Sequence, residues 1–215
     1  TIANKADLII AVGTRLQDFT TGSWTVFSMD SKFISINAAR HDATKHLSLP
    51  VVGDAKLALK TLSKACSGFK ASYEWMSFAQ DERRKWNAYV SDNISVVNNR
   101  PNSYAQAIGV VNAICDKRDR IVAAAGGLPA EVTANWRTLD IGTVDVEFGF
   151  SCMGYEIAGA WGAKIAQSQN EPERDTISFC GDGSYLMLNS DIYSSVLSNK
   201  KLIIILLDNG GFSGY

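Results

Sequence analysis

Two short glycine-containing segments carry the side chains in this sequence that are best suited to chemistry. Gly181-Asp182-Gly183-Ser184 follows one apolar run, and Asn209-Gly210-Gly211 follows the next. Asp182 and Asn209 are 27 positions apart, close to the roughly 30 residues of one βαβ unit. One carboxylate and one amide oxygen, beside glycine backbone, suit Mg²⁺, which takes its other ligands from water and phosphate groups. Gly183 would also let backbone N–H groups approach a diphosphate.

Two other interpretations of the first glycine segment remain open. It could be no more than a tight turn between a strand and a helix. It could also belong to a dinucleotide site, with Asp208 at the end of the next strand. Against that site, the third glycine position of the dinucleotide motif holds Leu186, and Asp182 stands where a pyrophosphate must come close. The second glycine segment, at a matching spacing, favours the metal and diphosphate interpretation.

The elements that must position these segments alternate between strands and helices. Apolar runs predict strands over residues 6–13, 32–37, 51–54, 120–125, 176–180 and 202–207. Helical spacing and capping residues predict helices from Asp54 to about 66, from a cap at Asn102 or Ser103 to 115, over 154–166 and over 185–197. Such alternation is typical of parallel sheets covered on both faces. Ligands bind such sheets at the carboxyl ends of the strands, where Asp182 and Asn209 are expected to meet.

Composition and charge exclude several classes of protein. Of the 215 residues, 46% are hydrophobic and 20% are charged, as in ordinary core-forming proteins. The formal net charge of −1 provides no field for nucleic acid or anionic lipid. No apolar run reaches the roughly 18–20 residues of a membrane-spanning helix. The four cysteines form no close pair, so we expect reduced thiols in a cytoplasmic protein rather than disulfides or a zinc site: Cys66, Cys115, Cys152 and Cys180.

The chain is expected to be part of a longer protein. It begins at Thr1 without a Met, and it stops at Tyr215, before the helix that would normally cover the strand over 202–207. Two α/β parts are expected, over residues 1–66 and 102–215. The residues between them, 67–101, are polar and aromatic and are expected to form a solvated helical connector.

The spacing of the two glycine segments resembles the signature of the thiamine diphosphate-dependent enzymes. That signature is Gly-Asp-Gly followed by Asn at the spacing seen here, with 25 residues between Gly183 and Asn209. The resemblance implies thiamine diphosphate and Mg²⁺ as cofactors. It also implies that the Asp182 carboxylate, the Asn209 side chain and the Gly211 carbonyl hold the metal. Asp208 stands where the family usually has another Asn, which leaves the ligand position intact.

A further segment, Ser151-Cys152-Met153-Gly154, resembles the part of this family that surrounds the aminopyrimidine ring of the cofactor. The resemblance implies that the Met153 side chain bends the cofactor. The Met153 N–H and the Ser151 carbonyl would bind the edge of the ring. Taken alone, Met153 could equally be a core residue that fills a gap. The other residues expected at the cofactor follow two strands: Gly127, Leu128, Gly181, Gly183 and Ser184.

The same resemblance assigns the domains. Residues 1–66 resemble the C-terminal part of the family's Rossmann-like middle domain, and 102–215 resemble its diphosphate-binding domain without its C-terminal end. The expected fold class is therefore α/β, with parallel sheets covered by helices. The family's activating Glu lies on a separate pyrimidine-binding domain, across a dimer interface, so no catalytic residue is expected in this chain. Glu156 is interpreted as a helix-start residue.

The resemblance also implies an activity. Residues 13–23, 123–129 and 148–160 most resemble the family's hydrolases that open the ring of a polyhydroxylated cyclic 1,2-dione in myo-inositol degradation. The intact protein is then expected to be a homodimer or homotetramer that acts on a small molecule, and the chain alone to be inactive. His41 and His46 lie too far from the glycine segments to be assigned to catalysis. Two alternatives remain: a carboligase similar to acetohydroxyacid synthase, and a non-catalytic nucleotide-binding α/β module.

Overall fold

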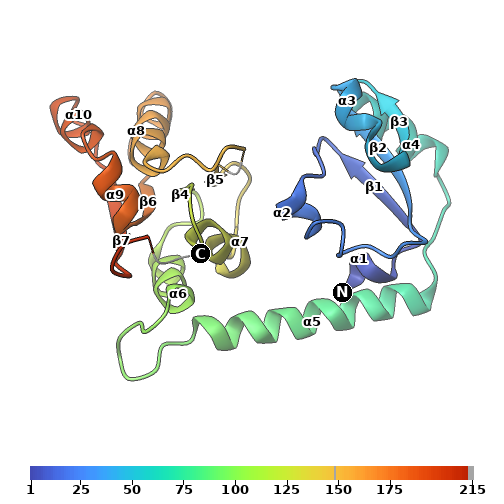
Figure 1. Cartoon of the computed structure of the whole chain (residues 1–215), viewed down its shortest axis with the longest axis horizontal. Coiled ribbons are helices and arrows are strands. Elements are labelled where there is room, and N and C mark those ends of the chain that lie inside the picture. The colour runs from blue at the N-terminus through green and yellow to red at the C-terminus, as the bar shows by residue number, and fades with distance from the viewer. Residues whose placement is uncertain (148, 213–215) are drawn as a thin grey trace. The chain divides into compact units, whose positions relative to one another are not determined.

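Two separate units make up the chain. The computed structural model describes residues 1–147 and 149–212, and it divides into Thr1–Asn87 and Ala88–Tyr215. Phe148, which begins one of the segments with family resemblance, and residues 213–215 lie outside the described residues. Each unit contains one parallel sheet with its own helices (Figure 1).

The first unit is a three-stranded sheet in the order β1-β2-β3, and all of its pairs are parallel. Helices α3 and α4 pack against β2, and the Asp54 side chain caps α4 by accepting a hydrogen bond from the Leu57 N–H at 2.9 Å. Thus the cap predicted from sequence is confirmed. The elements of this unit are α1 (Ile2–Lys5), β1 (Leu8–Val12), α2 (Asp18–Thr21), β2 (Lys32–Asn37), α3 (Arg40–Ala43), the 3₁₀ turn η1 (Lys45–Leu47), β3 (Leu49–Val52) and α4 (Ala55–Ala65).

Helix α5 (Tyr73–Ile94) occupies most of the segment between the two α/β parts. The division between the two units, after Asn87, falls within this helix. All 22 residues of this helix lie within the described part of the chain, and Val90 is the only one of them that is buried. The helix is therefore largely exposed along its length.

The second unit is a four-stranded sheet in the order β5-β4-β6-β7, again with parallel pairs throughout. Its strands are β4 (Arg120–Ala123), β5 (Val144–Val146), β6 (Thr176–Gly181) and β7 (Ile203–Leu207). Gly181 pairs with Leu207, so β6 and β7 end side by side. The parallel α/β fold expected from sequence is confirmed in both units.

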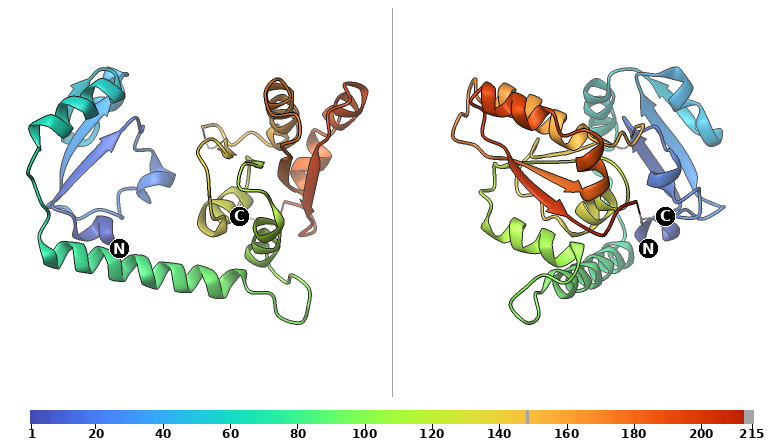
Figure 2. Two further views of the ribbon diagram at one scale, coloured as in Figure 1. Left: turned by 180° about the vertical axis from the view of Figure 1, so that it is seen from behind. Right: turned by 60° about the vertical axis from the view of Figure 1, so that its left-hand side comes forward.

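Helices cover both faces of the second sheet. Alternate residues of each strand point to opposite faces, and the apolar residues of β4 and β6 on both faces are buried by helices. On one face, β4 and β6 pack with α6 (Tyr104–Ile114) and α7 (Leu128–Asn135) around a buried cluster of Ile108, Val111, Ile121, Ala123, Leu128, Val132, Ile177 and Phe179. On the other face, α8 (Tyr155–Gln167) packs against β4 and β6, and α10 (Asp191–Leu197) packs against α8 (Figure 2). Ser103 caps α6, as predicted, by accepting from the Gln106 N–H.

One local prediction about this unit is wrong, and two of its elements were not predicted. The helix expected over 185–197 is two helices, α9 (Asp182–Met187) and α10, because the backbone is extended at Leu188 (φ −151°, ψ 89°). Helix α7, which was not predicted, begins at Leu128 with Pro129 in its first turn, where a missing N–H costs nothing. Strand β5 was not predicted, since three residues give too short a pattern to recognise.

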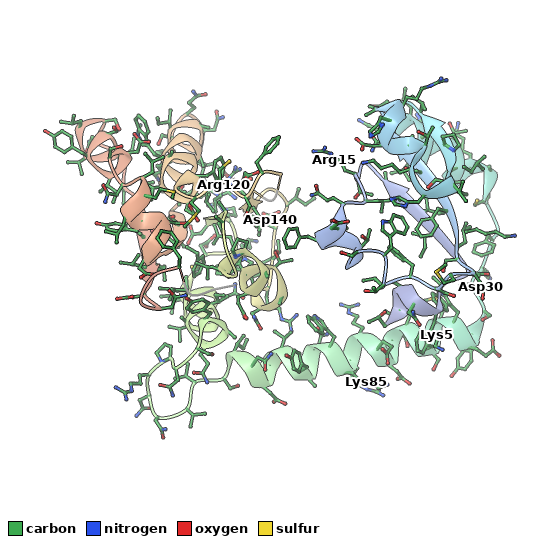
Figure 3. All side chains as sticks on the ribbon, viewed as in Figure 1. Lys5, Arg15, Asp30, Lys85, Arg120 and Asp140 are labelled. Carbon is green, nitrogen blue, oxygen red and sulfur yellow. The ribbon has the colours of Figure 1, made fainter. Side chains whose placement is uncertain are left out.

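Polar contacts at the strands complete this sheet. Arg120, at the start of β4, donates from Nη1 to Asp145 Oδ2 on β5 at 2.8 Å, and Figure 3 labels this arginine.

The four cysteines are all free thiols. Within residues 1–147 and 149–212, we find no helix that is both long enough and apolar enough to cross a membrane.

Candidate cofactor site

The loops that follow β4, β6 and β7 converge on one small cavity at the carboxyl edge of the second sheet. Its volume is about 100 Å³. All of its lining residues belong to the second unit: Tyr104, Ala125, Gly126, Gly127, Leu128, Met153, Gly181, Asp182, Gly183, Ser184, Asn209, Gly211 and Phe212. Residues from five separate parts of the sequence therefore meet at this edge.

Nearly all of the residues singled out from sequence lie at this cavity. Asp182, Asn209 and Gly211, the expected metal ligands, line it together. The six expected cofactor contacts that also line it are Gly127, Leu128, Met153, Gly181, Gly183 and Ser184. Ser151 is the exception, because it is absent from the lining, although its φ of +53° marks a sharp bend just before Met153.

At Gly183 a side chain would overlap the Phe212 ring unless that ring moved. A Cβ at this position would come within 2.8 Å of Cε1 of Phe212, so the aromatic ring covers the glycine directly. This contact joins the start of α9 to the loop after β7. The Phe212 side chain therefore packs directly against the backbone of the segment over residues 181–184.

The loop after β7 turns through a local hydrogen bond. Asp208 Oδ1 accepts from the Gly210 N–H at 2.9 Å, an arrangement typical of Asx turns. Thus the residue that departs from the family pattern shapes the turn that presents Asn209 and Gly211. Its carboxylate is engaged in this bond, while Asn209 lines the cavity.

Tyr104, at the start of α6, is a site residue that sequence reasoning missed. Its helical spacing with Ile108 and Val111 is that of a core-facing residue, and its side chain does pack beside the core cluster. It also lines the cavity, and its hydroxyl and the Asn209 side chain are hydrogen-bonded. Burial and then the negative charge of Asp182 raise the pKa of Tyr104 above its ordinary value. In the sequence, the one feature that could have indicated a role for Tyr104 at the site is its hydroxyl group, which is unusual on an apolar helix face.

Glu156, in the first turn of α8, is 1% exposed. Its Oε1 accepts from the Ala125 N–H at 3.1 Å, and its Oε2 accepts from the Gly154 N–H at 2.8 Å. Its backbone carbonyl accepts from Ser178 Oγ at 2.8 Å. The interpretation of Glu156 as a helix-start residue is correct for its position but omits these contacts, which tie α8 to the loop after β4 and to strand β6.

A second glutamate, Glu147, organises the loop after β5. Its carboxylate accepts from the Phe150 N–H and from the Cys152 N–H, each at 2.8 Å. These backbone hydrogen bonds hold the pKa of Glu147 below its ordinary value. The carboxylate therefore fixes the segment that leads into Met153.

Gly154 joins this loop to α8 in a conformation that requires glycine. Its φ is +91°, and a Cβ would lie 2.4 Å from the Cβ of Leu188. Leu188 is the extended residue that separates α9 from α10. Because the predicted helix is interrupted at Leu188, the Leu188 side chain packs against the loop that carries Met153.

The chemistry of the lining fits a hard cation better than a transition metal. Among the described residues no group of three or more His, Cys, Asp and Glu could hold a metal. The cavity instead offers one carboxylate, one amide and backbone carbonyls, the oxygen donors that Mg²⁺ accepts while keeping several waters. None of the described lining residues is Lys, Arg or His. A bound diphosphate would therefore need its charge balanced by a metal ion.

Cys180, which precedes this edge on β6, is buried. Burial first, and then the charges of Glu156 and Asp182, raise the pKa of its thiol to about 12. Because the thiolate is the reactive form of cysteine, this thiol is inert at neutral pH. Both histidines belong to the first unit, where the ring of His46 lies against that of Trp24 with centroids 3.4 Å apart.

Comparison with known protein families identifies both halves of the chain. Residues 124–213 match the family described as "Thiamine pyrophosphate enzyme, C-terminal TPP binding domain". Residues 1–62 match "Thiamine pyrophosphate enzyme, central domain". Thiamine pyrophosphate is another name for thiamine diphosphate, so these matches agree with the resemblance in the sequence motifs.

Several similar proteins carry the name 3D-(3,5/4)-trihydroxycyclohexane-1,2-dione hydrolase. The protein of this name from Geobacillus thermodenitrificans (strain NG80-2) is 36% identical over 99% of this chain and 36% of its own length. The one from Clostridium botulinum (strain Alaska E43 / Type E3) is 35% identical over 98% of this chain and 36% of its own. The one from Bacillus anthracis (strain CDC 684 / NRRL 3495) is 36% identical over 99% of this chain and 36% of its own length. The chain therefore spans about a third of the length of these relatives.

Proposed function

Because the chain belongs to the thiamine pyrophosphate enzymes, we propose that its second unit binds the diphosphate end of thiamine diphosphate through Mg²⁺. The Asp182 carboxylate, the Asn209 side-chain oxygen and the Gly211 carbonyl are the proposed metal ligands. One observation carries this proposal: these three residues line the same cavity, and none of the described residues around it is a cation. The metal would supply the positive charge that the protein lacks there.

The backbone around the cavity supports the placement of the diphosphate. Helix α7 begins at Leu128 after Gly127, and no side chain caps it. The N–H groups of the first turn of a helix have no partner within the helix, and they favour an anion. Gly127 and Leu128 both line the cavity. The start of α7 thus offers hydrogen-bond donors to phosphate oxygens.

The size of the cavity supports a site for one end of the cofactor. Its volume of about 100 Å³ is well below the roughly 300–1,000 Å³ of pockets that enclose a whole small molecule. We therefore propose that this chain binds the diphosphate and that Met153, at the cavity wall, supports the middle of the cofactor. The other end would contact a part of the intact protein outside these residues.

For the intact protein we propose hydrolysis of a trihydroxycyclohexane-1,2-dione, the reaction named in its relatives. Such hydrolysis breaks the C–C bond between two carbonyl-derived carbons and adds the elements of water, which opens the ring to an open-chain deoxy-uronate. When bound, thiamine diphosphate supplies the electron sink that this cleavage requires. The residues of this chain hold the cofactor and fix its orientation. We place this reaction in the cytoplasm, in myo-inositol degradation.

We propose that the acid that activates the cofactor lies elsewhere in the intact protein. Asp182 is the only acidic residue among the described residues that line the cavity, and it is assigned to the metal. Both carboxylate oxygens of Glu156 already accept backbone hydrogen bonds. Residues 1–215 alone are therefore expected to be inactive, and the working enzyme to be a homodimer or homotetramer.

The test is an assay of the full-length protein with thiamine diphosphate, Mg²⁺ and the cyclic dione. We expect consumption of the dione and release of an open-chain acid, and no reaction when either cofactor is left out. Condensation of two pyruvate molecules in place of ring opening would instead identify a carboligase. Failure to bind thiamine diphosphate at all would favour a non-catalytic α/β module.

A further inference from the structure

Glu156 is a buried carboxylate, and its position in the first turn of a helix offsets only part of the cost of burying its charge. Its side chain is 1% exposed. Among the described residues, no Lys, Arg or His forms an ion pair with it. Burial of a carboxylate without a cation is costly, and hydrogen bonds to the charge and the positive N-terminal end of α8 offset that cost. An apolar side chain of the same size would avoid the cost of burying a charge, but it would leave the Ala125 and Gly154 N–H groups without their acceptor. What the glutamate supplies here is therefore these two hydrogen bonds.

The two hydrogen bonds of the carboxylate connect loops that lie far apart in the sequence. Ala125, which donates to Oε1, precedes the Gly126-Gly127 loop at the diphosphate side of the cavity. Gly154, which donates to Oε2, directly follows Met153. One side chain therefore fixes the position of the Met153 loop relative to the loop after β4.

We propose that Glu156 is a positioning residue of the cofactor site, which holds the loop beneath the centre of the cofactor at a fixed distance from the loop that faces the diphosphate. This inference rests on the proposed function. Glu156 itself does not line the cavity, so it acts through Ala125 and Gly154 and not by contact with the cofactor. It matters most for a ligand long enough to touch both loops at once.

Glu156→Gln tests this role in the full-length protein. The amide keeps the size of the side chain, and its oxygen can accept from one backbone N–H group, but its NH₂ group then faces the other. We expect the affinity for thiamine diphosphate with Mg²⁺ to fall about tenfold or more, the effect of one charge-assisted hydrogen bond. Inorganic pyrophosphate with Mg²⁺, a probe that reaches only the diphosphate loop, should lose much less affinity.

Thr176→Val is the matched control. Thr176, which is fully buried on β6, donates to Gln167 on α8, so this variant removes a buried polar contact of α8 without altering either loop that the Glu156 carboxylate joins. That contact lies at the opposite edge of the sheet from the cavity, because β6 begins at Thr176. We expect the control to lower the unfolding temperature without changing the ratio of the two affinities.

The ratio of the two affinities decides the outcome. Parent-like affinities for both ligands in Glu156→Gln, or an equal loss for both, would overturn the positioning role. If Glu156→Gln does not fold, Glu156→Asp keeps the charge on a side chain too short to reach both loops, and the same ratio is measured. Failure of the unsubstituted protein to bind thiamine diphosphate would instead contradict the proposed function itself.

Discussion

At the scale of single residues, the site depends on polar groups that orient one another. The Asn209 side chain has two chemically different ends, and only its oxygen can bind a cation. The hydrogen bond between Asn209 and the Tyr104 hydroxyl fixes how this amide is turned. Partners of this kind around metal ligands contribute to affinity even though they never touch the metal.

Tyr104→Phe is predicted to weaken the Mg²⁺-dependent binding of thiamine diphosphate about fivefold, the value of one neutral hydrogen bond of about 1 kcal/mol. The ring and its packing against the core stay in place, so the unfolding temperature should change little. Titration calorimetry on the full-length protein measures the affinity. Tyr193→Phe, at a residue 67% exposed on α10, is the control and should bind as the parent does. Equal affinities in the parent and Tyr104→Phe would show that the hydroxyl does not orient Asn209.

At the scale of elements, every strand except β5 was predictable from sequence, and the connections between the strands and helices were not. Apolar runs and caps such as Asp54 and Ser103 are local signals, and the structure confirms them. The meeting of Asp182 and Asn209 at one cavity also followed from the spacing of parallel strands. The contacts of Glu156 escaped prediction because its partner Ala125 lies 31 positions away. The same holds for the break at Leu188, which packs against Gly154 on a distant loop.

Gly154→Ala is predicted to destabilise the second unit by about 1–3 kcal/mol. The backbone at this residue has a positive φ, which strains alanine, and the added Cβ would overlap the Leu188 side chain. Urea unfolding of the full-length protein measures this loss. Gly162→Ala is the control on the same helix: its Cβ would meet nothing within 4 Å, and alanine favours the helix by up to about 1 kcal/mol. Equal stabilities of the two variants would contradict the packing described for Gly154.

The loop after β5 is predicted to weaken in acid through Glu147. Since backbone N–H groups lower the pKa of Glu147 from its ordinary value of 4.5 in the folded protein, its ionised form stabilises the fold. This stabilisation is complete above pH 4.5 and is lost as the pH falls through the lower folded-state pKa. The difference in free energy of unfolding between the parent and Glu147→Gln should therefore narrow on acidification. A difference that stays constant with pH would rule out this contribution.

At the scale of the whole molecule, all of the candidate chemistry lies in one unit. Every described lining residue of the cavity belongs to residues 88–215, and the unit over 1–87 matches the central domain of the family over its first 62 residues. The cavity of about 100 Å³ is smaller than pockets that enclose a whole small molecule. Under the proposed function, the rest of the cofactor would therefore contact other parts of the intact protein.

The most direct test is calorimetric titration of the full-length protein with thiamine diphosphate, in Mg²⁺ and in a chelator. We predict binding only in the presence of the metal. Asp182→Ala should weaken binding about 10–100-fold or more, the effect of losing a metal-site group, and Asn209→Ala should weaken it less because it removes a neutral ligand. Binding that needs no divalent cation, or that is unchanged in Asp182→Ala, would contradict a magnesium–diphosphate site at this edge of the sheet.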